Sequence, residues 1–239
     1  GVVMWSTSMR RTVSSPPRRT RREALRTLTA AGVVTASAAL LTGHGAEALA
    51  ATPALLPHPG ALIMIIRHGE KPSDSDGSPG MDGTGKHDSH SLTTRGWTRA
   101  RALVQLFAPV AGAAGPRMTR PTAIYASGGD GGEGRRTRQT VTPLAAYLRV
   151  PVDTSFSKGH ESALARHVAS RTEPTLICWQ HGELPAIASA LATVTPAPPT
   201  SWPDDRFDLI WALAPTGAGW SFHQIPELLL QGDSNRAIA

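Results

Sequence analysis

The stretch that decides the fold is Ala61-Leu62-Ile63-Met64-Ile65-Ile66-Arg67-His68-Gly69-Glu70. Its first six residues are apolar, and a run this short with several β-branched side chains predicts a strand over 61–66 that is buried on both faces. Arg, His and Gly follow at the point where this strand must end. Because open α/β sheets bind their ligands beyond the carboxyl ends of the strands, this placement predicts a functional site.

The three residues after the strand have properties that suit phosphate chemistry. His68 offers a nitrogen nucleophile that is largely neutral near pH 7. Arg67 offers a planar guanidinium that matches two oxygens of a phosphate. Gly69 lets a bulky anion approach the backbone, because it has no side chain.

Strand and helix patterns continue to alternate along the chain. Strands are expected over 122–126, 175–180, 207–213 and 220–225, and helices over 94–108, 135–148 and 161–170, with a further helix starting near Pro185. Such alternation predicts one α/β domain with a mostly parallel sheet. The last two strands are expected as an antiparallel pair at the sheet edge, and the loop over 71–91 is long enough to be either functional or disordered.

Three more motifs follow the first in a fixed order. They are Leu92-Thr93-Thr94-Arg95-Gly96 at a helix start, Arg136-Thr137-Arg138-Gln139-Thr140 in the next long helix, and His181-Gly182 after the expected strand 175–180. Together with Arg67-His68-Gly69, this order resembles the histidine phosphatase superfamily, also called phosphoglycerate mutase-like. The resemblance covers about residues 61–232 and implies a three-layer α/β/α sandwich with a mostly parallel sheet.

The resemblance also implies a role for each motif. His68 takes the phosphoryl group from a small phosphorylated substrate, and water then cleaves the phosphohistidine. Arg67 and Arg136 bind the phosphate, with Arg135 as the alternative to Arg136, and His181 hydrogen-bonds the phosphoryl group during transfer. Arg136 is expected at the start of its helix, where free N–H groups also favour an anion. This chemistry implies no cofactor and no metal.

The proton donor to the leaving oxygen is open among three carboxylates. Glu161 lies between the second long helix and strand 175–180, where one branch of the superfamily keeps its acid, and it is preferred. Glu183 follows His181 by two residues, whereas another branch has an Asp directly after that His. Glu70 is close to the nucleophile in sequence. A structural alternative for Glu161 is that it stabilises a helix N-terminus through the helix dipole.

Two departures from the superfamily pattern bear on activity. A Gly-rich segment over 128–134 follows Ser127, where the superfamily has Ser-Pro-x-x-Arg, and this leaves the presentation of Arg136 open. The stretch 153–175 is too short for the insert with which phosphoglycerate mutases hold a sugar-acid phosphate, so a phosphatase is expected rather than a mutase. The rival interpretation is a secreted binding protein of the same fold that keeps the phosphate pocket and lacks turnover.

The positive charge of the chain is concentrated at its N-terminus. The formal net charge is +6, but residues 1–50 contribute seven Arg against two Glu, which leaves 17 basic and 16 acidic residues in the rest of the chain. The folded part therefore has no bulk charge that favours nucleic acid as a partner.

The same N-terminal residues have the order of an export signal. Arg21-Arg22 precedes an uncharged apolar stretch over 28–41, and Ala48-Leu49-Ala50 is a small-x-small cleavage signal. This order predicts a twin-arginine signal peptide over 1–50 that engages the export machinery, a linker over 51–60 and a histidine phosphatase domain over 61–239. Because the apolar stretch is short for a bilayer span, we expect a secreted or cell-envelope protein without stable membrane insertion after cleavage. The alternative is an uncleaved membrane-anchoring helix.

Two further patterns argue against other chemistry. Cys178 is the single cysteine, so no intrachain disulfide is expected, and its place in an apolar strand predicts an inert buried thiol. His87-Asp88-Ser89-His90 and Asp74-Ser75-Asp76-Gly77 lack the remaining ligands of a zinc or a calcium site.

Overall fold

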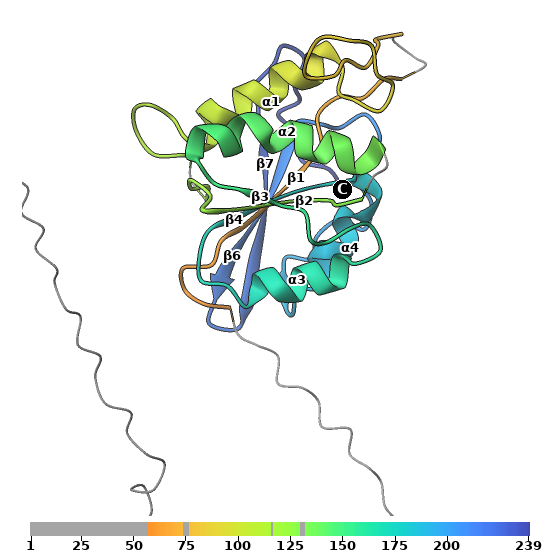
Figure 1. Ribbon diagram of the computed structural model, residues 1–239. Helices are drawn as coiled ribbons and strands as arrows, with labels where there is room; N and C mark the ends of the chain where they lie inside the picture. The colour runs from red at the N-terminus through yellow and green to blue at the C-terminus, as the bar shows by residue number, and fades with distance from the viewer. Residues whose placement is uncertain (1–56, 74–76, 116, 130–131) are drawn as a thin grey trace, which may run out of the picture. The chain divides into compact units, whose positions relative to one another are not determined.

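The computed structural model describes residues 57–73, 77–115, 117–129 and 132–239, all of which belong to the compact unit Ala51–Ala239 (Figure 1). The predicted signal peptide and most of the predicted linker lie outside the described residues. Within the described ranges, no helix is long and apolar enough to cross a bilayer.

A seven-stranded sheet forms the centre of the domain, in the order β3-β2-β4-β1-β6-β7-β5. Its strands are β1 (Ile63–Arg67), β2 (Ala123–Ala126), β3 (Val152–Asp153), β4 (Thr175–Trp179), β5 (Val194–Thr195), β6 (Leu209–Thr216) and β7 (Gly219–Pro226). The pairs β1–β6 and β6–β7 are antiparallel, and the other four neighbouring pairs are parallel. The prediction of a mostly parallel sheet is confirmed.

Helices cover both faces of this sheet (Figure 1). They are α1 (Thr94–Phe107), α2 (Gly132–Leu148), α3 (Glu161–Ala169) and α4 (Leu184–Ser189), and a short 3₁₀ turn, η1 (His181–Glu183), leads into α4. Helices α1 and α2 pack on one face, and α3 and α4 on the other. The predicted three-layer α/β/α sandwich is therefore confirmed.

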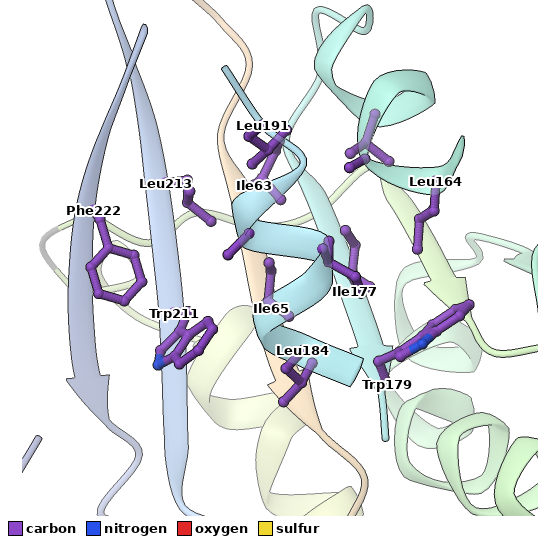
Figure 2. Packing of buried hydrophobic residues seen from close by; sticks show 14 of the residues in the cluster. Ile63, Ile65, Leu164, Ile177, Trp179, Leu184, Leu191, Trp211, Leu213 and Phe222 are labelled. Atoms are coloured by element: carbon purple, nitrogen blue, oxygen red, sulfur yellow. The ribbon is translucent and has the colours of Figure 1, made fainter. Parts of the chain in front are cut away.

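The core consists of two apolar clusters because side chains of a strand alternate between the faces of its sheet. Along β1, Ile63 and Ile65 join the cluster under α3 and α4, whereas Met64 and Ile66 join the cluster under α1 and α2. Figure 2 shows Ile63 near Leu191 and Ile65 near Leu184 of α4. Burial on both faces explains why β1 reads as an uninterrupted apolar run.

Several element boundaries differ from the sequence-based prediction. Helix α2 begins at Gly132, three residues before the predicted start, so part of the Gly-rich segment is helical. Strands β3 and β5 were not predicted, since two residues show no periodicity. The pair β6–β7 is antiparallel as predicted, but it does not form the sheet edge, because β5 pairs with the outer side of β7.

Candidate active site

The sheet topology brings three distant segments to one edge. Strands β1 and β4 are parallel neighbours with Arg67 opposite Trp179, so His68 and His181 follow adjacent strand ends. Strand β6 runs antiparallel to β1, with Ile210 opposite Ile66. The loop that precedes β6 therefore reaches the same edge as the loops that follow β1 and β4.

His68 is held with one ring nitrogen available for attack. The residue is buried, its backbone N–H donates to the carbonyl oxygen of Trp179 at 3.1 Å, and its Nδ1 lies 2.8 Å from the carbonyl oxygen of Gly69. A carbonyl only accepts hydrogen bonds, so the neutral ring carries its proton on Nδ1 and keeps a lone pair on Nε2. Burial, followed by the charge of Arg67 and more weakly that of Arg136, lowers the pKa of His68 to about 3. The ring is therefore neutral and nucleophilic at physiological pH.

Arg67 presents one edge of its guanidinium to the site. The group is 1% exposed, and its Nη1 donates to the backbone carbonyls of Pro203, Asp204 and Arg206 at 3.1, 2.7 and 3.0 Å. Its Nε and Nη2 are also buried, and neither has a hydrogen-bond partner in the described part of the chain. These two nitrogens lie on one edge of the guanidinium, and such an edge matches two oxygens of a carboxylate or a phosphate. Burial lowers the pKa of Arg67 to about 10, which still leaves it cationic.

Two further groups act electrostatically at this position. His181 is in η1 and is partly buried, and its pKa is lowered by burial and by the charge of Arg67. Lys71 lowers the pKa values of both His68 and His181, which places its charge near both rings. Lys71 was not among the predicted site residues. Its position three residues after His68 could have indicated that its charge lies near the site.

The structure distinguishes Arg136 from Arg135, the two arginines that the sequence left as alternatives for the site. Arg136 lowers the pKa values of both His68 and Arg67, so its charge lies near them. Arg135 instead pairs with Asp88 at 2.5 Å, on the exposed loop before α1. Because α2 begins at Gly132, Arg136 lies a full turn inside the helix, and the prediction that it sits at the helix start is wrong.

Gly69 and Gly96 are required by a close contact between backbones. A Cβ atom on Gly69 would lie 3.0 Å from the carbonyl oxygen of Gly96, and a Cβ on Gly96 would lie 2.5 Å from that of Glu70. The side of Gly69 that a side chain would occupy therefore faces α1, so the expectation that its missing side chain admits an anion is replaced by a packing role. Thr93 caps α1 by accepting the N–H of Gly96, which fixes the start of the helix against the segment that follows β1.

The three carboxylates considered as proton donors all have other partners. Glu161 is 7% exposed and accepts hydrogen bonds from the indole Nε1 of Trp179 at 3.0 Å and from the Gly159 N–H at 3.0 and 3.1 Å. Glu183 pairs with Lys158 at 2.9 Å. Glu70 accepts hydrogen bonds from Arg95 and Arg99. No hydrogen bond or ion pair joins these three carboxylates to either histidine within the described ranges.

A carboxylate that sequence reasoning missed does contact a histidine. Asp204 Oδ1 lies 2.6 Å from Nε2 of His181. Asp204 belongs to the loop before β6, which contains no motif that marks it. Beside it opens a cavity of about 640 Å³. The residues that line this cavity are Glu70, Lys71, Pro72, Ser73, Arg95, Arg99, Asp204, Asp205, Phe207, Asp208, Gly232 and Asp233.

A buried ion network forms one wall of the cavity. Arg99 is 2% exposed and pairs with Glu70 at 2.8 Å, Glu227 at 2.7 Å and Asp233 at 2.7 Å. Burial raises the pKa of Glu227 to about 7, against the opposing charge of Arg99. By holding Glu70, the network fixes the segment that follows His68.

Two other features of the described residues concern a thiol and a metal site. Cys178 is buried as predicted, and burial raises the pKa of its thiol well above the ordinary value. Across the described ranges, no group of three or more His, Cys, Asp or Glu side chains is arranged to hold a metal ion.

Comparison with known proteins gives structural matches alone. No family model matches the sequence, and no curated protein matches it. Among solved structures, SixA from Agrobacterium tumefaciens is 16% identical, with a TM-score of 0.42, and covers 69% of this chain and 95% of its own. The mycobacterial glucosyl-3-phosphoglycerate phosphatase is 13% identical, with a TM-score of 0.43, over 70% of this chain and 97% of its own. YhfR from Bacillus stearothermophilus is 15% identical, with a TM-score of 0.42, over 72% and 97%. These likenesses concern the fold.

Proposed function

We propose that this chain is a phosphatase that hydrolyses a phosphomonoester through a phosphohistidine intermediate. The observation that carries the proposal is the arrangement of His68 and Arg67. The ring of His68 is neutral and keeps Nε2 available, and the adjacent guanidinium has a buried edge without a hydrogen-bond partner among the described residues. A nucleophile beside a vacant fork for two oxygens suits attack on a phosphoryl group.

Each step of the reaction then has a group to support it. His68 Nε2 attacks phosphorus, so that an N–P bond forms and the P–O bond to the alcohol breaks. The leaving oxygen takes a proton from a carboxylic acid, for which Glu161 is the candidate from sequence. Water then attacks the phosphohistidine, which releases inorganic phosphate and the neutral ring. Arg67, Arg136 and His181 stabilise the charge on the transferring oxygens.

The export prediction is part of the proposal. The twin-arginine pattern over 1–50 supports delivery to the cell envelope or the medium, where the enzyme would act on a small phosphorylated substrate. No metal and no cofactor enters the proposed reaction, so activity should survive treatment with a chelator.

Trapping the intermediate tests the proposed function. After incubation with a substrate carrying a labelled phosphoryl group, an acid-labile, base-stable adduct is expected on the wild-type protein. His68→Ala should lose both adduct and turnover, and the exposed His58→Ala, whose side chain lies in a turn before β1, should keep both. Phosphate binding without turnover or adduct would support the rival binding-protein function, and an adduct retained in His68→Ala would refute the nucleophile.

A further inference from the structure

Asp204 is tied to both sides of the phosphate-binding position. Its backbone carbonyl accepts a hydrogen bond from Arg67 Nη1 at 2.7 Å, and its side-chain Oδ1 lies 2.6 Å from His181 Nε2. The backbone contact belongs to the set of three carbonyls that orients the Arg67 guanidinium. The side chain itself is 81% exposed, so the carboxylate can move while its backbone stays fixed.

The same side chain lines a cavity that Phe207 also borders. This cavity of about 640 Å³ is bounded by Asp204, Asp205 and Phe207 on one side. The Phe207 ring centre lies 6.1 Å from that of His68 and 3.8 Å from the Arg67 guanidinium carbon. Phe207 therefore lies between His68 and the cavity that Asp204 also lines.

Asp204 occupies Nε2 of His181, the ring that stabilises the transferring oxygens under the proposed function. When a phosphoryl oxygen takes that position, the carboxylate must turn away, and the cavity lies next to it. There its carboxyl group lies beside the space left for the alcohol.

On the basis of the proposed phosphatase function, we propose that Asp204 is the proton donor to the leaving oxygen. As His68 Nε2 bonds to phosphorus and the P–O bond breaks, the proton of the Asp204 carboxyl moves to the leaving oxygen and yields the neutral alcohol. The resulting carboxylate then accepts a proton from the water that attacks the phosphohistidine. The oxygen of that water becomes part of inorganic phosphate, and the Asp204 carboxyl group is protonated again.

The surroundings of the sequence-based candidate point the same way. Both oxygens of Glu161 accept N–H donors, from Gly159 and, for one of them, also from Trp179. Both oxygens of Glu161 are therefore already engaged by N–H donors of the fold. Glu161 does not line the cavity, whereas Asp204 does.

Leaving-group dependence tests the inference. An aryl phosphate leaves as a stable phenolate and needs little protonation, whereas an alkyl phosphate needs much more. With the full chain, p-nitrophenyl phosphate and glycerol 2-phosphate are compared for wild type, Asp204→Asn, Asp153→Asn and Glu161→Gln. Asp204→Asn should lower kcat for the alkyl substrate by about 10²–10⁴-fold and affect P–O cleavage of the aryl substrate far less. With the aryl substrate it should also accumulate the phosphohistidine. Asp153→Asn removes an exposed carboxylate on β3 that does not line the cavity, and it should show neither effect.

The possible failures are distinguishable. Equal losses of P–O cleavage with both substrates in Asp204→Asn would mean that Asp204 only positions His181 or Arg67, and would overturn the inference. Leaving-group dependence in Glu161→Gln instead would also overturn it and assign the acid to Glu161. In either case an inactive His68→Ala would leave the phosphatase function standing. Full activity in His68→Ala, or no hydrolysis of either substrate by wild type, would overturn both proposals.

Discussion

Replacing the buried Glu227 by Gln should remove a pH dependence from the stability of the fold. Glu227 shares the buried Arg99 with Glu70 and Asp233, and Arg95 adds a second, half-exposed guanidinium. Three carboxylates thus face two cations, and burial raises the pKa of Glu227, the most enclosed of the three, from 4.5 to about 7. A rise of this size is equivalent to about 3 kcal/mol, because a tenfold change in proton affinity corresponds to about 1.4 kcal/mol.

The sign of the effect follows from proton uptake. Between pH 4.5 and 7 the unfolded chain has released the Glu227 proton and the folded protein has kept it, so the free energy of unfolding falls as pH rises. This stabilisation is fully present below pH 4.5 and is lost above about pH 7. In Glu227→Gln no proton is exchanged. The stability of wild type relative to Glu227→Gln should therefore decrease by about 3 kcal/mol across that window.

Urea unfolding at a series of pH values measures this difference. The matched control is Glu173→Gln, which removes a carboxylate from a surface pair with Arg171. The pKa of Glu173 is lowered by its hydrogen bonds with Arg171, so the stability of this control relative to wild type should stay constant above pH 4.5. A flat difference for Glu227→Gln over the same range would refute the claim that the network keeps a proton.

Two further predictions concern the contact between Gly96 and Glu70 and the predicted signal peptide. Gly96→Ala would place a Cβ 2.5 Å from the Glu70 carbonyl oxygen, and overpacking of about 1–3 kcal/mol should exceed the gain of about 1 kcal/mol from helix propensity; urea unfolding should show a net loss and activity should fall, whereas Gly83→Ala, where a Cβ meets nothing within 4 Å, should be near neutral. For export, N-terminal sequencing of the secreted protein should begin at or near Ala51, and normal export of a variant with Arg21→Lys and Arg22→Lys would contradict the twin-arginine assignment.

The parts of the fold that were predictable are those that a local pattern determines. Strands β1 and β4 are mostly apolar because both of their faces are buried. Helix α1 starts where Thr93 supplies a cap. The positions of His68 and His181 were predicted from the same runs, because each run stops where polar residues begin, and that point is the carboxyl end of the strand.

The remaining parts depend on contacts between distant residues. Asp204 meets His181 only because β6 runs antiparallel to β1 and its preceding loop reaches the edge where β4 ends. No local pattern in the loop before β6 encodes that register. The same holds for the contact between Gly69 and Gly96, which explains both glycines by backbone packing that neither motif shows by itself.

The two unpartnered nitrogens of Arg67 link ligand binding to the stability of the fold. A buried donor without a partner destabilises a protein by about 1–3 kcal/mol, and Arg67 has two such nitrogens among the described residues. A bound phosphoryl oxyanion would satisfy both at once. Under the proposed function, phosphate at about 100 times its dissociation constant would add about 2.7 kcal/mol to the free energy of unfolding. An exported enzyme of this kind would then resist unfolding and proteolysis best where its own product accumulates, and would be most fragile where phosphate is scarce.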